Sequence, residues 1–158
     1  SVSPNADLIL VVDEPLGWAS LPRDVAQTQT VIVSRNHCPA YRLDLLERGP
    51  AALIFPKSTQ SILLTLNLVA EGETVHPNVH TPLTPAERYT VRYTARGHTN
   101  KEIAKVRNIS EGRIKNILSA VYEKLNLKSR VQIAHYYYGN WHLLPGWTPP
   151  EHISLKSL

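Results

Sequence analysis

The chain has 158 residues, a length typical of one domain or of two small ones. Its 42 % apolar and 19 % charged residues are close to globular averages, which argues against a disordered chain. No apolar run approaches 18 residues, so we expect no membrane-spanning helix, and the single cysteine excludes an internal disulfide. With no leader pattern and one cysteine, a cytoplasmic location is expected.

The net charge of +4 is unevenly distributed along the chain. Residues 1–80 contain five Lys and Arg against eight Asp and Glu, whereas residues 81–158 contain twelve against five. The two halves therefore carry −3 and +7. A basic half beside an acidic half favours a polyanionic partner for the second half alone, although two solvated surfaces of unequal charge would give the same numbers.

Residues 1–75 have the pattern of a small parallel sheet. Short runs rich in Val, Ile and Leu at residues 8–12, 30–34 and 51–55 predict strands that are covered on both faces. Helices are expected between them, at residues 22–27 and 39–47. A third is expected at residues 59–70, where apolar residues recur at helical spacing: Ile62, Leu63, Leu66 and Val69. The order βαβαβα predicts right-handed crossovers in a partial α/β domain.

Residues 76–82 are expected to be a linker, because the stretch around them contains two prolines and no amphipathic period, and the charge reverses there. His76 and His80 lie four residues apart in this stretch, but the adjacent prolines argue against a metal site on a helix. We expect neither a metal nor a cofactor.

Residues 83–142 predict four helices. Thr84, Pro85 and Glu87 have the pattern of a capping box with proline in the first turn, and Gly97 ends the first helix. The capping pattern recurs at residues 99–102 and begins a second helix that extends to about residue 106. Asn108 then occupies the turn, where asparagine tolerates a left-handed conformation.

The third helix, from a cap at Ser110 to about residue 126, has an apolar stripe formed by Ile114, Ile117, Leu118, Val121, Tyr122 and Leu125. Its opposite face presents Arg113, Lys115, Asn116 and Ser119. A fourth helix is expected from a cap at Ser129 to about residue 141, followed by an irregular tail at residues 143–158.

A short helix, a tight turn and a longer helix with a basic outer face are typical of the helix-turn-helix, which places that outer face in the major groove. Lysine, asparagine and serine can bond to base edges. The start of the second helix offers phosphate ligands in Thr99, Asn100 and Lys101, and the start of the fourth offers Lys128 and Arg130. A solvated face without function is the alternative.

Four segments resemble the LuxR/FixJ/NarL-type helix-turn-helix: LTPAER at 83–88, GHTNKEIA at 97–104, ISEGRIKN at 109–116 and KLNLKSR at 124–130. The resemblance implies a four-helix DNA-binding domain of a transcriptional regulator. It puts base reading on Lys115, Asn116 and Ser119, and phosphate contacts around residues 99–101 and 110–113, including Ser110 and Arg113. Members of the family often dimerise through the fourth helix, here with Val131, Ala134 and Tyr138 on one side.

The chain departs from this family at three positions. The family usually has threonine at position 113, histidine at 117 and a buried leucine at 107, where this sequence has Arg113, Ile117 and Arg107. Arg113 adds a donor at the start of the helix. Arg107 either extends its charged end to solvent or leaves the packing to Val106.

Residues 31–37, 45–49, 52–58 and 70–73 resemble the last two βα units of a receiver domain, the phosphorylated domain of many such regulators. The resemblance places Ser34 near the switch hydroxyl and Lys57 near the phosphate-pairing lysine, with Asp13 off register from the phosphoacceptor. About 45 residues of a receiver are absent and only one acidic cluster is present, so we expect no control by phosphorylation. Both a degenerate receiver and a fragment of a normal one fit this pattern.

Other groups of reactive residues give weaker signals. Cys38 beside His37 lacks an oxyanion-forming loop, so we expect no enzyme, and the tyrosines at 136–138 are expected to pack a core or a dimer contact rather than to stack on bases. The sequence therefore predicts a LuxR-type transcriptional regulator that binds double-stranded DNA as a homodimer. The alternatives are a protein-interaction module that regulates another transcription factor, and a phosphorylation-gated regulator whose first strands are missing from this chain.

Overall fold

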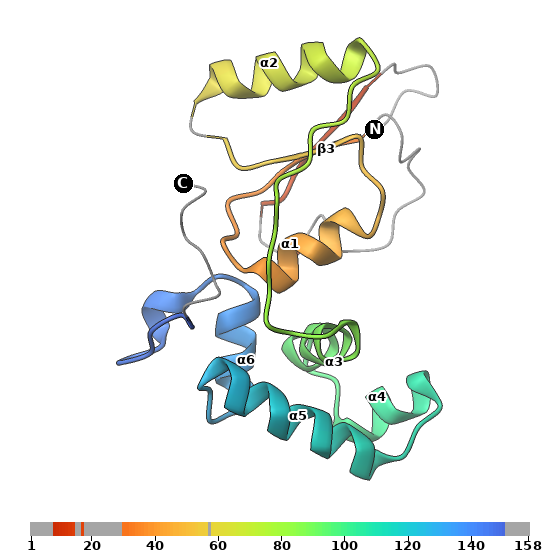
Figure 1. Ribbon diagram of the computed structural model, residues 1–158, viewed down its shortest axis with the longest axis vertical. Coiled ribbons are helices and arrows are strands. Elements are labelled where there is room, and N and C mark those ends of the chain that lie inside the picture. Colours follow the sequence, from red (N-terminus) through yellow and green to blue (C-terminus); the bar gives the residue numbers. More distant parts are fainter. Residues whose placement is uncertain (1–7, 15–16, 18–29, 57, 151–158) are drawn as a thin grey trace. The chain divides into compact units, whose positions relative to one another are not determined.

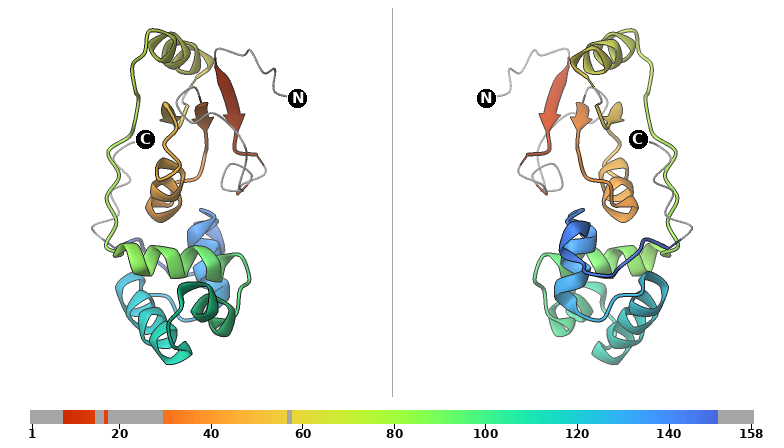
Figure 2. Two further views of the ribbon diagram at one scale, coloured as in Figure 1. Left: turned by 90° about the vertical axis from the view of Figure 1, so that its right-hand side faces the viewer. Right: turned by 90° about the vertical axis from the view of Figure 1, so that its left-hand side faces the viewer.

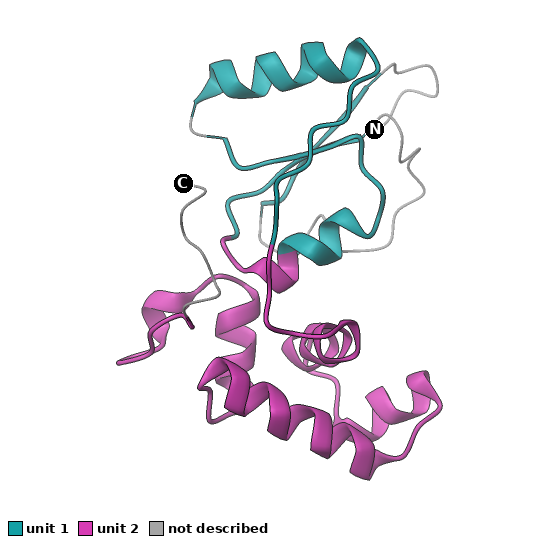
Figure 3. Cartoon of the chain, viewed as in Figure 1, with its two compact units in different colours: residues 1–36, 42–79 teal, residues 37–41, 80–158 magenta. Residues whose placement is uncertain are grey.

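The computed structural model describes residues 8–14, 17, 30–56 and 58–150 (Figure 1). The chain divides into two compact units (Figure 3). The first contains residues 1–36 and 42–79, and the second contains residues 37–41 and 80–158. Within the described ranges, no helix is long and apolar enough to cross a membrane.

Three parallel strands form the sheet of the first unit, paired in the order β1 (Ile9–Val12), β2 (Thr30–Val33) and β3 (Ala52–Ile54). The parallel sheet predicted from the sequence is thereby confirmed. The expectation that every strand is covered on both faces is wrong for β1, because Leu10 and Val12 are about half exposed on this edge strand. The central strand β2 is buried along its whole length.

Two helices, α1 (Pro39–Leu46) and α2 (Thr59–Ala70), accompany the sheet, and both agree with the predicted ranges. On α2, Val69 is buried in a core cluster with residues of β2 and β3, and Leu66 packs against that cluster. Leu63, which recurs at the same helical spacing, is not part of this packing, since it is 57 % exposed. Thr65 is buried instead, and its hydroxyl donates to the Ser61 carbonyl at 2.9 Å. The helix expected at 22–27 lies outside the described residues.

The segment after α2 remains attached to the first unit. Val75 forms a parallel bridge with Ala52, its N–H donates to the Ala51 carbonyl, and its own carbonyl accepts from Leu53, both at 3.0 Å. His76 Nε2 lies 2.7 Å from the Pro50 carbonyl oxygen. The outer edge of β3 is therefore partly closed by the start of the connecting segment.

The second unit contains the four expected helices: α3 (Pro85–Ala95), α4 (Asn100–Arg107), α5 (Glu111–Leu125) and α6 (Arg130–Tyr137). Each begins at a side-chain cap, in the order Thr84, Thr99, Ser110 and Ser129. Helix α3 packs against α5 and α6, and α4 packs against α5 (Figure 2). Helix α6 ends at Tyr137 instead of continuing to about residue 141.

After α6, the chain packs back onto the helices. A short 3₁₀ helix, η2 (Trp141–Leu143), is followed by Leu144, which is buried. The indole of Trp147 lies edge-on to the Tyr136 ring at 6.0 Å, and its Nε1 donates to the Leu125 carbonyl at 2.6 Å. The tail expected to be irregular from residue 143 is thus part of the packed unit as far as Trp147, although it lacks regular structure beyond η2.

Candidate nucleic-acid interface

Helices α4 and α5 form a helix-turn-helix. Asn108 follows α4 in the left-handed conformation, with φ 52° and ψ 47°, and Ile109 N–H donates back to the Ala104 carbonyl at 3.1 Å. Ser110 then caps α5 through the N–H of Arg113 at 3.2 Å. Helix α5 buries one stripe, namely Ile114, Leu118, Val121 and Leu125. Its opposite face is therefore the one turned to solvent.

The exposed face of α5 contains the predicted base-reading residues. Lys115, Asn116 and Ser119 are all exposed, as is Arg113 one turn earlier. Lys115 Nζ lies 3.3 Å from Glu111 Oε1 on the same helix, and the Ser119 hydroxyl donates to the Lys115 carbonyl at 3.0 Å. The ion pair between Glu111 and Lys115 was not predicted from the sequence, although a glutamate four residues before a lysine on a helix favours such a pair. The surface offers cationic, amide and hydroxyl groups on one helical face.

The start of α4 presents the predicted phosphate-binding segment. Thr99 and Glu102 form a capping box: Thr99 N–H donates to Glu102 Oε2 at 2.7 Å, and Glu102 N–H donates to Thr99 Oγ1 at 3.2 Å. The hydrogen bond from the Thr99 backbone N–H, and to a smaller extent the one from the Thr99 hydroxyl, holds the pKa of Glu102 below its ordinary value. Lys101 is exposed beside this cap, and the first-turn N–H groups of a helix favour an anion.

An open groove of about 780 Å³ separates the start of α3 from the first half of α5. Arg113 and Asn116 line it on the α5 side, and Thr84 lines it on the α3 side. Gly112 also borders the groove, and a Cβ placed there would meet only the Ser110 hydroxyl at 4.0 Å. Arg113 and Asn116 therefore border a concave surface, whereas Lys115 and Ser119 do not line it.

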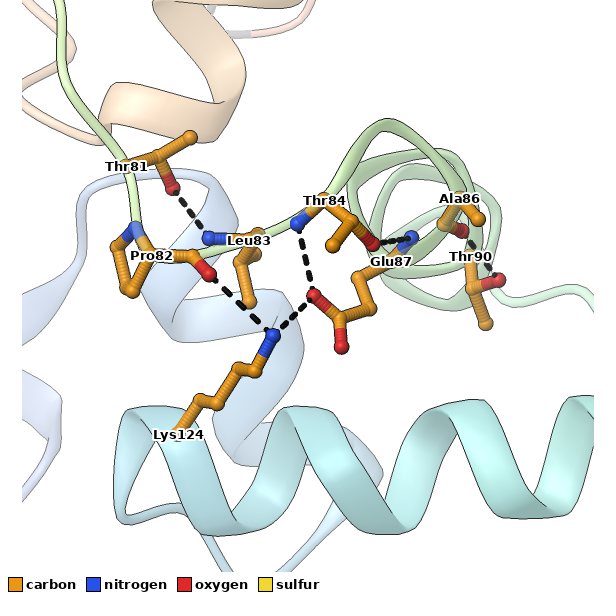
Figure 4. A network of polar contacts seen from close by, with 8 residues as sticks. All are labelled: Thr81, Pro82, Leu83, Thr84, Ala86, Glu87, Thr90 and Lys124. Carbon is orange, nitrogen blue, oxygen red and sulfur yellow. Dashed lines mark hydrogen bonds and ion pairs between the residues drawn. The ribbon is translucent and has the colours of Figure 1, made fainter.

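An ion pair between the exposed Lys124 and the buried Glu87 connects α5 to α3 (Figure 4). Lys124 Nζ donates to Glu87 Oε2 at 2.8 Å, and the same carboxylate oxygen accepts from Thr84 N–H at 2.7 Å. Burial alone raises the pKa of Glu87, but the hydrogen bonds from Lys124 and Thr84 outweigh it and leave the pKa below its ordinary value. The sequence identifies Glu87 as a capping residue. It does not predict the ion pair of Glu87 with Lys124, because the two residues are 37 positions apart in the chain.

Arg107 occupies the position where the resembled family usually has a buried leucine, and its side chain contacts α3. Its guanidinium carbon lies 5.0 Å from the centre of the Tyr89 ring, and Nη1 donates to the Ala86 carbonyl at 3.4 Å. The alternative that Val106 takes over the packing is wrong, because Val106 is largely exposed. The arginine stem fills the position and its charged end rests on an aromatic ring.

The two cations at the start of α6 differ in their surroundings. Lys128 is exposed, whereas Arg130 is half-buried and donates from Nη1 to Asn100 Oδ1 at 2.7 Å. Arg130 Nη2 also donates to the His98 carbonyl. The structure thus brings two predicted phosphate ligands, Arg130 and Asn100, into contact with each other.

The predicted dimer residues lie along α6 and its C-terminus. Val131 is largely exposed, while Ala134 and Tyr138 are half-buried. Tyr136 and Tyr137 are fully buried, which removes both from any surface for base stacking. Burial is also the main reason why the pKa of Tyr136 is raised.

At the carboxyl ends of β1 and β2, the structure brings Asp13 and Ser34 together. The Ser34 hydroxyl donates to Asp13 Oδ2 at 2.7 Å, and both residues are buried. The third predicted switch position, Lys57, lies outside the described residues. Cys38 is buried, and the described residues contain no group of three or more His, Cys, Asp or Glu that could hold a metal ion.

The four helices of the second unit are similar to a known protein family. The family described as "Bacterial regulatory proteins, luxR family" matches residues 81–137. These residues form a LuxR-family helix-turn-helix domain. Relatives named as HTH-type transcriptional regulators, Rv0890c of Mycobacterium tuberculosis and Mb0914c of Mycobacterium bovis, are 47 % identical to this chain over 51 residues. The match covers 32 % of this chain and only 6 % of the length of each relative.

Solved structures of response regulators are also similar to this chain. RcsB from Salmonella enterica serovar Typhimurium, bound to promoter rprA, is 17 % identical over 68 % of this chain and 58 % of that one, with a TM-score of 0.47. The response regulator ChrA of a heme-sensing two-component system is 15 % identical over 82 % and 74 %, with a TM-score of 0.34.

Proposed function

We propose that the LuxR-family domain binds double-stranded DNA sequence-specifically and that the chain acts as a transcriptional regulator in the cytoplasm. The observation that carries this proposal is the exposed face of α5, where Lys115, Asn116 and Ser119 lie opposite a fully buried apolar stripe. Such a face fits the major groove, where lysine suits guanine acceptors and asparagine can bond bidentately to adenine.

Contacts to the DNA backbone would flank this face. Phosphates are assigned to exposed groups at the starts of α4, α5 and α6, namely Thr99, Lys101, Ser110, Arg113 and Lys128, together with the half-buried Asn100. The family names and the net charge of +7 on residues 81–158 support a polyanionic partner. Homodimerisation through Val131, Ala134 and Tyr138 would place two copies on paired half-sites and multiply a modest single-domain affinity.

The test is selection of bound sequences from a random duplex pool, followed by titration of the winning duplex at several salt concentrations. Binding should weaken steeply with salt, and Lys101→Ala should reduce the slope of log K against log salt by about 0.9. Asn116→Ala should leave that slope unchanged but relax the preference at one base pair by about 1–3 kcal/mol. Arg35→Ala removes an exposed cation of the first unit and is the matched control, with no expected effect.

A protein-interaction module would give a different result. In that case no sequence would be enriched, and the affinity for any duplex would be nearly independent of salt or too weak to measure. If the wild-type chain enriched no DNA sequence, that result would contradict the proposal of sequence-specific DNA binding.

We also infer that aspartyl phosphorylation does not control this chain. Only Asp13 and Glu14 provide carboxylates at the described sheet edge, and Asp13 is engaged by the Ser34 hydroxyl. A Mg²⁺-dependent phosphorylation site needs several carboxylate ligands. Incubation with a small phosphodonor and Mg²⁺, followed by intact-mass measurement, should show no adduct; a stoichiometric phosphoryl adduct would support the phosphorylation-gated alternative.

A further inference from the structure

Arg130 connects α6 to the start of α4. It is the first residue of α6, and its guanidinium donates to Asn100 Oδ1 at 2.7 Å and to the His98 carbonyl. Asn100 is the first residue of α4, and His98 immediately precedes the Thr99 cap. The planar fork of one arginine therefore holds the chain on both sides of that cap.

The same turn is held from α3. His98 N–H donates to the Tyr93 carbonyl at 3.1 Å, and the His98 ring lies edge-on to the Tyr93 ring at 5.2 Å. Gly97, with φ +89°, makes the turn possible and donates to the Thr94 carbonyl at 3.0 Å. Because α6 itself packs on α3, Arg130 completes a frame in which the start of α4 is fixed by both helices.

The contact also orients the Asn100 amide. Its Oδ1 accepts from the Arg130 guanidinium, so the two amide N–H donors of Asn100 are directed away from that cation. Amide donors beside the exposed Lys101 and the first-turn N–H groups are suited to a phosphate oxygen. The arginine charge, by contrast, is already committed to two acceptors within the protein.

We propose that Arg130 is a positioning residue that fixes the phosphate-facing start of α4 and orients Asn100, and that it does not itself bind DNA phosphate. This inference rests on the proposed DNA-binding function. It replaces the sequence-based assignment of Arg130 to the phosphate ligands, and it leaves Asn100 in that role. It also makes the placement of α4 depend on α6, the helix that carries the proposed dimer contact.

The experiment compares Arg130→Ala, Arg130→Lys, Asn100→Ala and the double variant Arg130→Ala/Asn100→Ala in the full chain, with Lys128→Ala as the matched control. Affinity for the selected duplex is measured from low to high salt, and thermal unfolding is measured without DNA. Arg130→Ala should weaken binding roughly tenfold with an unchanged salt slope, whereas Lys128→Ala should reduce the slope by about 0.9. Arg130→Lys should not restore the affinity, because an ammonium group cannot hold both acceptors in the arginine geometry.

Thermal unfolding separates this inference from the proposed function. The Tm losses of Arg130→Ala and Asn100→Ala should be non-additive, since each removes the same contact. A salt slope reduced by about 0.9 in Arg130→Ala, with affinity rescued in Arg130→Lys, would overturn the positioning role while leaving DNA binding intact. If wild-type protein binds no duplex but the Tm losses remain non-additive, the DNA-binding proposal fails and the Arg130–Asn100 link stands. Additive Tm losses would overturn the link itself.

Discussion

Lys124 on α5 and Glu87 on α3 form an ion pair of 2.8 Å, and the Glu87 carboxylate is only 9 % exposed. Glu87 also completes the capping box at the start of α3. One carboxylate thus caps the first turn of α3 and anchors the last turn of α5. The orientation of α5, and with it the proposed DNA-reading face, depends on this contact.

Replacing Lys124 by methionine should lower the free energy of unfolding by about 1.5–3 kcal/mol, because a buried carboxylate loses its charged donor while the apolar stem is retained. Chemical denaturation followed by circular dichroism measures the change. Lys128→Met removes an exposed lysine near the same end of the domain and should have little effect. Equal losses in the two variants would contradict the structural role given to Lys124.

Stability should fall at acidic pH, and Glu87 should account for part of the loss. Its pKa is lower in the folded chain than in the unfolded chain, so its contribution is present above the unfolded pKa and is lost as pH falls through the folded value. Glu87→Gln should therefore have a lower Tm at pH 7 and a smaller decrease in Tm between pH 7 and acidic pH. Glu123→Gln, at an exposed position of α5, should retain the wild-type pH profile.

The turn between α4 and α5 gives a prediction about backbone strain. Asn108 has φ 52°, where a residue with a Cβ and no local polar compensation is disfavoured by about 1–2 kcal/mol. Asn108→Ala should lower the free energy of unfolding by that amount, whereas Asn108→Gly should be close to neutral, since glycine adopts this conformation readily. An alanine variant as stable as the glycine variant would show that the turn is not left-handed in solution.

At position 107, leucine should be tolerated and alanine should be destabilising. Arg107→Leu should keep or slightly raise Tm, because a half-buried charge is replaced by an apolar side chain of adequate size beside Tyr89. Arg107→Ala should lower the free energy of unfolding by about 1 kcal/mol, since the packing of the arginine stem is lost. A marked loss of Tm in the leucine variant would mean that the cation on Tyr89 contributes more than the stem.

The tail after α6 should contribute to the stability of the LuxR-family domain. Trp147→Phe removes the Nε1 donor to the Leu125 carbonyl together with part of the ring that packs on Tyr136 and Trp141, and should cost at least about 0.5–1.5 kcal/mol. His142→Ala, at an exposed residue of the neighbouring 3₁₀ helix, is the control. Differential scanning calorimetry of both variants tests whether residues beyond position 137 belong to the cooperative unit.

The starts of the helices of the second unit could be predicted because their causes are local, whereas the end of α6 at Tyr137 was not predicted. Thr84, Thr99, Ser110 and Ser129 each cap their own helix through an N–H group three residues ahead, so a short window of sequence contains both partners. The left-handed conformation of Asn108 between α4 and α5 also has a local cause, because asparagine tolerates this conformation better than most residues. The faces of α5 followed from helical periodicity, which places apolar residues on one stripe.

The contacts that position the site could not be predicted in the same way. Arg130 and Asn100 are 30 residues apart, and no spacing rule relates side chains that meet only after three helices have packed. Similarly, a run of valines and leucines does not reveal that β1 is an edge strand, because the same composition suits a central strand. Long-range pairing and sheet position are properties of the tertiary fold.

The pairing of Val75 beside β3 uses backbone groups that an open sheet edge would expose. Its N–H and its carbonyl are bonded to the Ala51 carbonyl and the Leu53 N–H, respectively. Those two groups at the edge of β3 are therefore not available to a strand of another chain, which lowers the tendency of this edge toward intermolecular pairing.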